Sequence, residues 1–496
     1  MTTAQTPRSV PAAGSPALIG RDLATLWHPC SQMRDYRTFE PLHVVGAEGC
    51  RLRLADGRVV LDAISSWWCK TLGHGHPRLR AALQRQAARF EHVILANTTS
   101  EPIVRLAERL LSMANGDDAM HWGPGAPAGR RAGHFGKAFF ADNGSTAVEV
   151  AMKMAIQAHA QCGRPQRTRF ASLQNGYHGE TIATLSVGDC GLYSKPYEAL
   201  MFDTVKLTGL AYRSGVDDPA WGDASAQWPA IERQLDAVAR DLAAVVYEPI
   251  LQAAGGMRIY SPDLLRRLRD WADAHEVYLI ADEIAAGMGR CGEMLAHFTG
   301  ARCRVPGAAG AQKGECDNGG RIALPDFVVL SKGLTAGVVP MSVVLTTDGI
   351  YDVFDADYTD LRAFLHSNTY TGNALAVAVA NEVLDVFVDE RVLEHVAAVG
   401  PVLLQGLGEL QSTRPYLHHV RGIGMVAAVD IRQRDGSPLD WKKRTGYRVF
   451  QCATERGALL RPLGDTMYLF PPLNTSRADI TAMISVLADA LDHVMG

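Results

Sequence analysis

The sequence predicts an α/β protein with a large domain, built on a mostly parallel sheet, and a small α+β domain. Short apolar runs alternate with helical segments through the middle of the chain, which is typical of α/β folds. These runs are apolar throughout, which indicates strands buried on both faces, as in parallel sheets. At 496 residues and 53.6 kDa the chain is long enough for two or more domains.

The elements of the large domain follow from local patterns, taken in chain order. The segment 145–160 (STAVEVAMKMAIQAHA) places its apolar residues on one face and predicts a helix. Continuous apolar runs predict strands, and one further amphipathic stretch predicts a helix. The expected strands are 169–173, 242–250, 277–281, 326–331 and 341–346, and the second helix is 262–275.

The C-terminal part has a different pattern, with long helices around short strands. We expect helices over 374–388 and 477–494, and strands at 425–429 and 467–470. This mixture predicts the small α+β domain, completed by the first 60 to 70 residues. The expected division is a flexible leader at 1–18, small-domain parts at 19–70 and 375–496, and a large domain at 71–374.

Three segments interrupt these patterns without periodicity of their own. Residues 115–134, 212–229 and 301–321 are rich in Gly, Ala, Pro or polar residues, so we predict surface loops. They serve either as solvated connectors or as a lid or interface. The leader lacks the continuous apolar core of a secretory signal.

Composition narrows the class of protein. The formal net charge is −4 without a long basic run, which disfavours nucleic acid or an anionic membrane as partner. No apolar stretch approaches the roughly 20 residues of a membrane-spanning helix. The nine cysteines form no C-x-x-C pair, which favours free thiols in a reducing cytoplasm over disulfides or a metal site.

Two charged residues end neighbouring buried strands. Lys332 follows the run PDFVVLS, and Asp282 follows VYLIA. Burial of an ammonium is costly and lowers its pKa, which makes a neutral amine available as nucleophile or base. A lysine that binds an aldehyde and an aspartate that keeps a pyridine nitrogen protonated are the groups that pyridoxal phosphate requires.

Further strand ends carry residues suited to a phosphate and a planar ring. Gly144 and Ser145 open a helix, where free N–H groups favour an anion, although Ser145 can also be a plain cap. Tyr177, between glycines, can stack on a ring or fill a turn. His178 is more typical of a hydrogen-bonded structural histidine. Glu248 can pair with a cation or stay buried.

Two aromatic residues and an arginine suggest a substrate channel. Trp67 and Trp68 are adjacent, so on a strand they would face opposite sides. They fill the core or form the wall of an apolar channel for a chain-like substrate. Arg461 lies in an apolar run and needs a carboxylate, from the protein or from a substrate.

Taken together, these motifs resemble the class III (ω-amino-acid) aminotransferases, which use pyridoxal phosphate on the type I fold with a seven-stranded large-domain sheet. The resemblance runs from about residue 23 to 490. The class motifs occur in order: Asn143-Gly144-Ser145, Gly176-Tyr177-His178-Gly179, Glu248-Pro249, Asp282-Glu283-Ile284, Ser331-Lys332-Gly333 and Thr369-Tyr370-Thr371-Gly372-Asn373. The double tryptophan and the Arg461-Pro462-Leu463-Gly464 segment are most similar to the biotin-pathway subfamily.

The resemblance implies a role for each site residue. Lys332 carries the cofactor as a Schiff base and is the catalytic residue, while Asp282 contacts the pyridine nitrogen. The other cofactor contacts are Gly144, Ser145 and Tyr177, together with Thr369 from the neighbouring subunit of a homodimer with composite sites. The substrate contacts are Trp67, Trp68, Tyr177 and Arg461, with Arg461 on the substrate carboxylate.

The subfamily also implies a reaction. Its members aminate 7-keto-8-aminopelargonate, usually with S-adenosylmethionine as donor, by ping-pong kinetics. Two positions depart from the pattern: Cys30 stands where an aromatic residue is common, and 366–369 reads His-Ser-Asn-Thr instead of His-Gly-Pro-Thr. Lysine is therefore an alternative donor, and another ω-amino-acid or diamine aminotransferase is the alternative activity.

Overall fold

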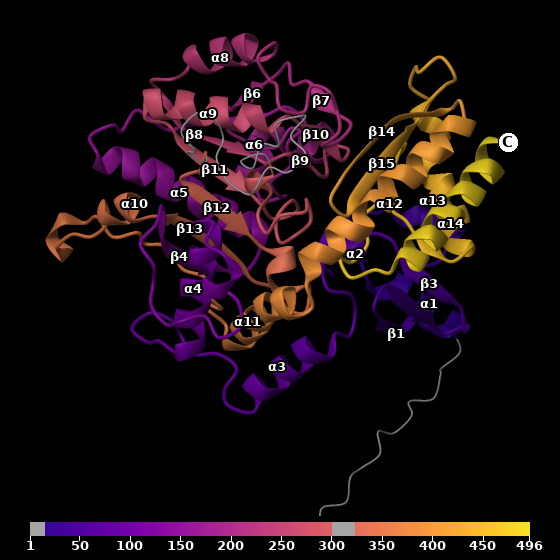
Figure 1. Ribbon diagram of the computed structural model, residues 1–496, viewed down its shortest axis with the longest axis horizontal. Coiled ribbons are helices and arrows are strands. Elements are labelled where there is room, and N and C mark those ends of the chain that lie inside the picture. The colour runs from indigo at the N-terminus through magenta and orange to yellow at the C-terminus, as the bar shows by residue number, and fades with distance from the viewer. Residues whose placement is uncertain (1–14, 300–322) are drawn as a thin grey trace, which may run out of the picture.

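A seven-stranded sheet forms the centre of the large domain in the computed structural model, which describes residues 15–299 and 323–496. Its strands are β4 (Phe135–Ala141), β5 (Arg169–Leu173), β6 (Val205–Leu207), β8 (Leu242–Tyr247), β11 (Tyr278–Asp282), β12 (Phe327–Leu330) and β13 (Ser342–Thr347). They lie in the order β4-β13-β12-β11-β8-β5-β6 (Figure 1). β13 alone runs opposite to the other six strands, so the mostly parallel seven-stranded sheet is confirmed.

The helices of this domain begin and end at residues with local signals. α5 (Gly144–Gln161) starts after Asn143, whose side chain caps it, and packs against β8, β11, β12 and β13. α9 (Pro262–His275) starts after the capping Ser261 and ends at Glu276 in the left-handed region. The remaining helices are α3 (Pro77–Ala87), α4 (Glu101–Ala114), α6 (Ile182–Val187), α7 (Gly191–Ser194), α8 (Trp228–Asp236) and α10 (Asp348–Asp352). At the boundary with the C-terminal part, α11 (Ala374–Asp389) packs against α3 and α4.

The C-terminal part folds around a second, antiparallel sheet. Its strands are β14 (Leu417–Ile423), β15 (Val426–Ile431) and β17 (Thr466–Leu469), and its helices are α12 (Val392–Thr413), α13 (Thr445–Glu455) and α14 (Arg477–Met495). α12 packs on β14 and β15, and α14 packs on α12 and α13. These elements lie to one side of the large sheet, in orange and yellow (Figure 1).

The N-terminal strands lie beside this C-terminal part. A four-stranded sheet joins β1 (Val44–Glu48), β2 (Arg51–Leu54) and β3 (Val59–Asp62) to β16 (Ala458–Leu459), which pairs parallel with β3. The indigo strands accordingly lie next to the yellow helices (Figure 1). We therefore propose that residues 19–70 and 375–496 form the small domain and that residues 71–374 form the large domain.

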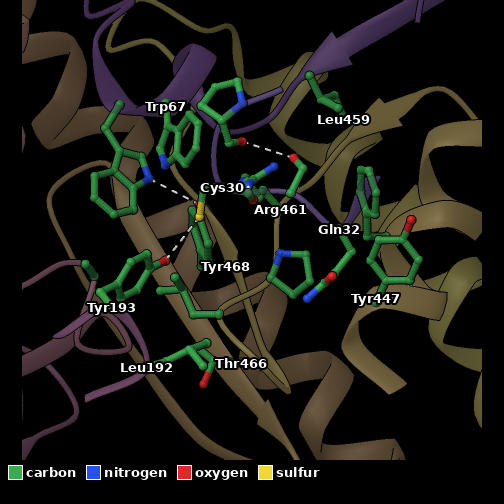
Figure 2. A pocket seen from close by; sticks show the side chains of 18 of the residues that line it. Cys30, Gln32, Trp67, Leu192, Tyr193, Tyr447, Leu459, Arg461, Thr466 and Tyr468 are labelled. Carbon is green, nitrogen blue, oxygen red and sulfur yellow. Dashed lines mark hydrogen bonds between the residues drawn. The ribbon is translucent and has the colours of Figure 1, made fainter. Parts of the chain in front are cut away.

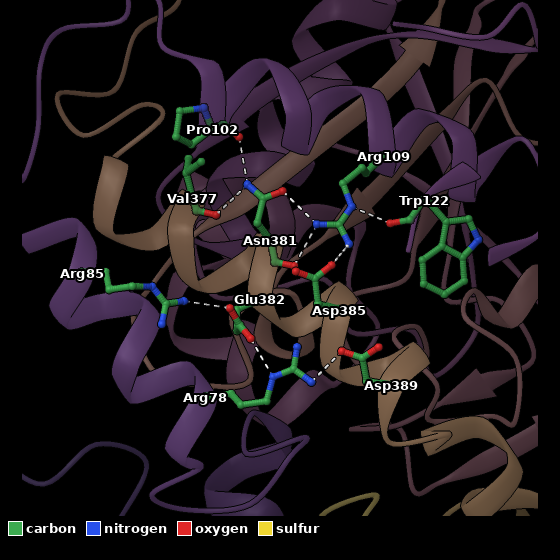
Figure 3. A network of polar contacts seen from close by, with 10 residues as sticks. All are labelled: Arg78, Arg85, Pro102, Arg109, Trp122, Val377, Asn381, Glu382, Asp385 and Asp389. Carbon is green, nitrogen blue, oxygen red and sulfur yellow. Dashed lines mark hydrogen bonds and ion pairs between the residues drawn. The ribbon is translucent and has the colours of Figure 1, made fainter. Parts of the chain in front are cut away.

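Ion pairs join α3 and α4 to α11 (Figure 3). Arg109 of α4 is only 2% exposed; it donates to Asp385 at 2.6 Å and to the Asn381 carbonyl at 2.9 Å. Arg78 of α3 donates to Glu382 at 2.7 Å. A buried guanidinium is tolerated only when its N–H groups have acceptors, so this network holds α11 in one place against the large domain.

The leader expected at 1–18 overlaps a helix. α1 (Ser15–Thr25) includes residues 15–18 and buries Ile19, whose apolar side chain gives the helix something to pack against; residues 1–14 lie outside the described part. The expected loop at 115–134 contains only a 3₁₀ turn, η2 (Ala119–His121). Among the described helices, none is long and apolar enough to cross a membrane.

The second expected loop, 212–229, contains more regular structure than its composition indicates. It begins with a short strand, β7 (Tyr212–Arg213), which pairs with β10 (Arg258–Tyr260), itself paired with β9 (Leu251–Gln252), and it ends in the first turn of α8. Strand pairing with a segment 46 to 48 positions away supplies hydrogen bonds that composition cannot reveal. The third loop, 301–321, lies outside the described residues.

Candidate active site

A cavity of about 270 Å³ lies at the carboxyl ends of β5, β8, β11 and β12. Parallel strands end at the same edge of a sheet, so the residues that follow them meet there. The lining includes five of the residues expected around a cofactor: Gly144, Ser145, Tyr177, Asp282 and Lys332. His178, Glu248, Ile284 and Ala285 complete much of the wall.

Lys332 stands on the floor of this cavity. It begins the 3₁₀ turn η5 (Lys332–Thr335) two residues after β12 ends, with φ at +38°. Burial lowers the pKa of its ammonium, although the charges of Asp282 and Glu248 oppose the shift. Its Nζ also lies 5.6 Å from the centre of the Trp68 ring. A fraction of the lysine is therefore neutral and able to react with an aldehyde.

The Asp282 carboxylate is held by a backbone amide just after its own strand and by a histidine. It is 3% exposed, accepts the Ile284 amide at 3.1 Å, and lies 2.8 Å from Nδ1 of His178. His178 is buried as well, and its Nε2 has no partner among the described residues. The histidine thus orients the carboxylate from behind, the structural role that its sequence context favours.

Glu248 follows β8 and has no basic partner at hydrogen-bonding distance among the described residues. Its carboxylate accepts the backbone amides of Tyr177 and Ala253, both at 3.0 Å. Burial and the charge of Asp282 raise its pKa to about 8. Of the two roles open to it, the structure shows a buried carboxyl that connects two strand-end loops.

The amino end of α5 forms the opposite wall and is shaped to admit an anion. A Cβ on Gly144 would lie 2.7 Å from Cδ1 of Ile284, so a larger residue there would have to displace that side chain. Gly179, with φ at +128°, passes so close to Ser145 that a Cβ would lie 2.1 Å from its Oγ. These backbones leave the free N–H groups of the helix open to the cavity, which suits a phosphate.

Tyr177 borders both this cavity and a second one. Its hydroxyl donates to Glu180 at 2.9 Å, and its ring packs edge-on against Tyr193 with centroids 5.9 Å apart. Burial raises the pKa of the phenol well above its ordinary value, so it stays neutral. A neutral ring fixed at both edges can stack on a flat cofactor. The donor set and shape of the inner cavity fit pyridoxal phosphate.

The second cavity is larger, about 1420 Å³, and opens outward from the first. Both cavities share Trp68, Ser145, Tyr177 and Lys332 in their linings. Its remaining lining is largely aromatic and apolar, with Tyr193, Leu192, Tyr447, Leu459 and Tyr468 among the residues that Figure 2 labels. This shape suits a chain-like substrate that extends away from Lys332.

Arg461 lies in the outer cavity without a carboxylate partner among the described residues. Its Nη2 donates to the Cys30 carbonyl at 2.6 Å, and its guanidinium lies over the Trp67 ring, 4.3 Å from the centroid (Figure 2). Cys30 in turn lies 3.5 Å from the Tyr193 hydroxyl. Of the two partners left open by the sequence, a protein carboxylate is not found beside Arg461 among the described residues.

Both tryptophans line the outer cavity because their segment is a left-handed turn. In α2 (Ser65–Trp68) all four residues have positive φ, between 46° and 71°. Left-handed helical conformation costs an L-residue ~1–2 kcal/mol, or ~4–8 kcal/mol for the turn. The expectation that adjacent tryptophans diverge holds for strands, and this segment is not one.

Thr369 lies apart from the other expected site residues. It is in the segment between η6 (Tyr358–Asp360) and α11, and it lines neither cavity of this chain. Sequence reasoning missed Tyr193, whose hydroxyl faces Cys30 from the short helix α7, a segment with no recognisable motif. It also missed Asp62, although an acid at the end of an apolar strand is the same signal that identified Asp282.

Comparison with known proteins agrees with this geometry. The Aminotransferase class-III family model matches residues 32–303 and 319–491. Adenosylmethionine-8-amino-7-oxononanoate aminotransferases from Synechococcus elongatus and Nitratidesulfovibrio vulgaris are 37% and 35% identical to this chain. Each alignment covers 95% of this chain, with 99% and 80% of the relatives respectively.

Solved structures show the same fold. The crystal structure of the enzyme of that name from Methanocaldococcus jannaschii has a TM-score of 0.83 at 27% identity, over 97% of this chain and 99% of the other. An amine transaminase from an uncultivated Pseudomonas species, in its PLP-bound form, has a TM-score of 0.80 at 30% identity, over 95% and 99%. The protein is thus an enzyme of the type I fold whose cofactor is pyridoxal phosphate, and it belongs to the class III aminotransferases.

Proposed function

We propose that this enzyme transfers an amino group to 7-keto-8-aminopelargonate (8-amino-7-oxononanoate) and so forms 7,8-diaminopelargonate for biotin synthesis. One observation carries the proposal: the two adjoining cavities have Lys332 on the inner floor and Arg461, with no protein carboxylate, in the outer wall. A keto acid whose reacting carbonyl is several carbons from its carboxylate suits this arrangement. The similarity to relatives named for this substrate supports the same reading.

Lys332 is the proposed catalytic residue, and the other groups of the inner cavity would hold the cofactor beside it. Bound pyridoxal phosphate supplies an electron sink for the carbon that loses its proton. Nζ of Lys332 would take that proton and later return it, as base and then acid, and burial, which lowers its pKa, favours the neutral amine. Asp282, fixed by His178, would face the pyridine nitrogen, while Gly144 and Ser145 would hold the phosphate and Tyr177 would cover the ring.

The proposed substrate contacts lie farther out. Arg461 would exchange the Cys30 carbonyl for the substrate carboxylate, while Trp67 and Trp68 would border the carbon chain. Because a guanidinium forms stronger hydrogen bonds to a carboxylate than to a neutral carbonyl, the exchange is favourable. The same cavity must accept both substrates in turn, which gives ping-pong kinetics.

S-adenosylmethionine is the proposed amino donor, with lysine as the alternative. Relatives named for adenosylmethionine support the first. The outer cavity has aromatic side chains at several levels, among them Tyr193 and Tyr447, which suit a nucleoside better than an aliphatic amino acid. Cys30 leaves more room beside Tyr193 than an aromatic residue would, so this position is where a different donor would be accommodated.

The enzyme is proposed to act in the cytoplasm as a homodimer with composite sites. Large apolar side chains are exposed on both sides of the segment that carries Thr369: Tyr358, Leu361 and Leu365 before it and Tyr370 after it. Exposed apolar groups of this kind mark protein interfaces. A second copy covering them would bring Thr369 to the partner's cofactor phosphate.

A single purified preparation tests the function. The holoenzyme is given S-adenosylmethionine or lysine, and the absorption band of the bound cofactor is followed; then 8-amino-7-oxononanoate is added and the diamine is measured. We expect conversion with S-adenosylmethionine alone and diamine formation after the keto acid is added. Conversion with lysine alone would keep the reaction and change the donor. If neither donor converts the cofactor, or the keto acid is not aminated, the enzyme is another ω-aminotransferase.

A further inference from the structure

The left-handed turn at Ser65–Trp68 is locally unfavourable, and a buried carboxylate, that of Asp62, forms hydrogen bonds to it. Four successive L-residues with positive φ are unfavourable, and glycine is absent from the turn. Internal hydrogen bonds close the turn, from the Trp68 amide to the Ile64 carbonyl at 2.9 Å and from the Cys69 amide to the Ser65 carbonyl at 3.0 Å. Such bonds are equally available to a right-handed turn, so they do not select the hand.

Asp62 makes hydrogen bonds to this turn from outside it. The residue is fully buried at the end of β3, next to the turn. Its carboxylate accepts the Ser66 amide at 3.0 Å, the Ser66 hydroxyl at 2.7 Å and the weaker Ile64 amide at 3.3 Å. His74 approaches the same carboxylate at 2.8 Å. These bonds attach both the backbone and the side chain of Ser66 to one fixed point.

The other side of the turn is anchored to the C-terminal part of the chain. The Ser65 hydroxyl donates to the Phe470 carbonyl at 2.7 Å, and the Trp68 indole donates to the Tyr468 hydroxyl at 3.2 Å. Between these anchors, Trp68 faces Lys332 while Trp67 lies under Arg461. The conformation of one turn therefore determines what borders both ends of the proposed substrate path.

We propose that Asp62 is a positioning residue for the amination of the keto acid, which it serves by holding Ser66 in the left-handed conformation that presents Trp67 and Trp68 to the cavity. The inference rests on the proposed function. Asp62 lines neither cavity and touches no reacting atom, so it acts only through the turn. Its effect is expected on the substrate whose carboxylate meets Arg461.

Two variants at Ser66 separate this role from a general loss of structure. Ser66→Ala and Ser66→Gly both remove the hydroxyl that binds Asp62, but only glycine adopts positive φ without steric cost. For the holoenzyme we expect alanine to lower kcat/KM for 8-amino-7-oxononanoate about tenfold, and glycine to leave it within about twofold. In ping-pong kinetics each kcat/KM reports its own half-reaction, and in the alanine variant that of the amino donor should fall less than that of the keto acid, because only the keto acid also depends on Trp67 beside Arg461.

A second pair tests Asp62 itself. Asp62→Asn is expected to lower the same kcat/KM at least about tenfold, and addition of Ser66→Gly to restore most of it. If the alanine and glycine variants behave alike, or if glycine fails to rescue Asp62→Asn, the proposal is overturned. An equal loss for the donor would overturn it as well, because that result means a general disturbance of the site.

A measurement without substrate keeps this test apart from the proposed function. Near-ultraviolet circular dichroism, compared between variants, includes the contribution of Trp68 packed against Tyr468, and thermal melting reports the strain of the turn. Asp62→Asn should reduce both the tryptophan signal and the melting temperature, and Ser66→Gly should restore both. If the wild-type enzyme does not aminate the keto acid, the proposed function fails while these readings still decide whether Asp62 holds the turn.

Discussion

Replacement of Arg461 by alanine should lower kcat/KM for the keto acid far more than kcat/KM for the amino donor. In the free enzyme the guanidinium donates to the neutral Cys30 carbonyl and stacks on Trp67. A hydrogen bond to a charged partner contributes ~1.5–3 kcal/mol and one to a neutral partner ~0.5–1.5 kcal/mol, so exchange of the carbonyl gains ~1–1.5 kcal/mol per bond. With one bond exchanged and a second one newly formed by the planar fork, the gain is ~2.5–4.5 kcal/mol, which corresponds to a loss of about 70- to 2,000-fold in kcat/KM for the keto acid.

The assay follows the two half-reactions separately by the cofactor spectrum. Arg461→Lys retains the charge but loses the fork and the flat contact with Trp67, so an intermediate loss is expected. The control is the double variant Asp35→Asn/Arg444→Gln. Arg444 lines the same cavity, yet Asp35 already binds it at 2.8 and 2.6 Å, and loss of both leaves the net charge unchanged.

We expect the control pair to change kcat/KM for the keto acid by about twofold at most. If the control variant lowers kcat/KM for the keto acid as strongly as Arg461→Ala does, the cavity binds this substrate through its overall polarity and not through Arg461. An equal loss in kcat/KM for the donor would also refute the assignment. It would mean either that Arg461 binds both substrates or that it only maintains the shape of the cavity.

Three further outcomes are expected. Lys332→Ala should abolish diamine formation, measured by product analysis, with the melting temperature within a few degrees of wild type. Arg109→Met should lower the free energy of unfolding by ~3–5 kcal/mol because Asp385 loses its partner, and Arg109→Met/Asp385→Leu should lose less in the same denaturant titration. Glu248, with a pKa of about 8 against an ordinary 4.5, keeps its proton in the folded state longer than in the unfolded state. Rising pH between these values therefore destabilises the protein, by about 5 kcal/mol at most, and apo Glu248→Gln should show a flatter fall in melting temperature over pH 4.5–8.5.

Local sequence patterns were sufficient for most elements of the large domain. The helix expected over 262–275 has the same bounds in the structure, because Ser261 and Pro262 mark its start within a single turn. The strands that end before Asp282 and Lys332 were recognisable because burial on both faces leaves them continuously apolar. Since parallel strands end at one edge, the same pattern also predicts that these two side chains meet, and the structure places both in one cavity.

Residues whose conformation depends on distant partners could not be predicted in this way. The antiparallel direction of β13 depends on β4, about 200 residues earlier, and its apolar composition is the same in either direction. Likewise, the contact of Arg461 with the Cys30 carbonyl joins segments 431 positions apart. Nothing near Arg461 in the chain identifies that partner.

The double tryptophan shows most clearly which properties follow from the local sequence and which depend on the tertiary structure. Its chemistry, two large aromatic side chains suited to a channel wall, is evident from the residues alone. Its geometry is not, because local preference disfavours four successive left-handed residues. The turn is instead bound by tertiary partners, Asp62 at the end of β3 and the Phe470 carbonyl 405 positions along the chain. The residue types and their order thus specify the cofactor chemistry, whereas the shape of the substrate cavity depends on tertiary hydrogen bonds that hold a locally unfavourable turn.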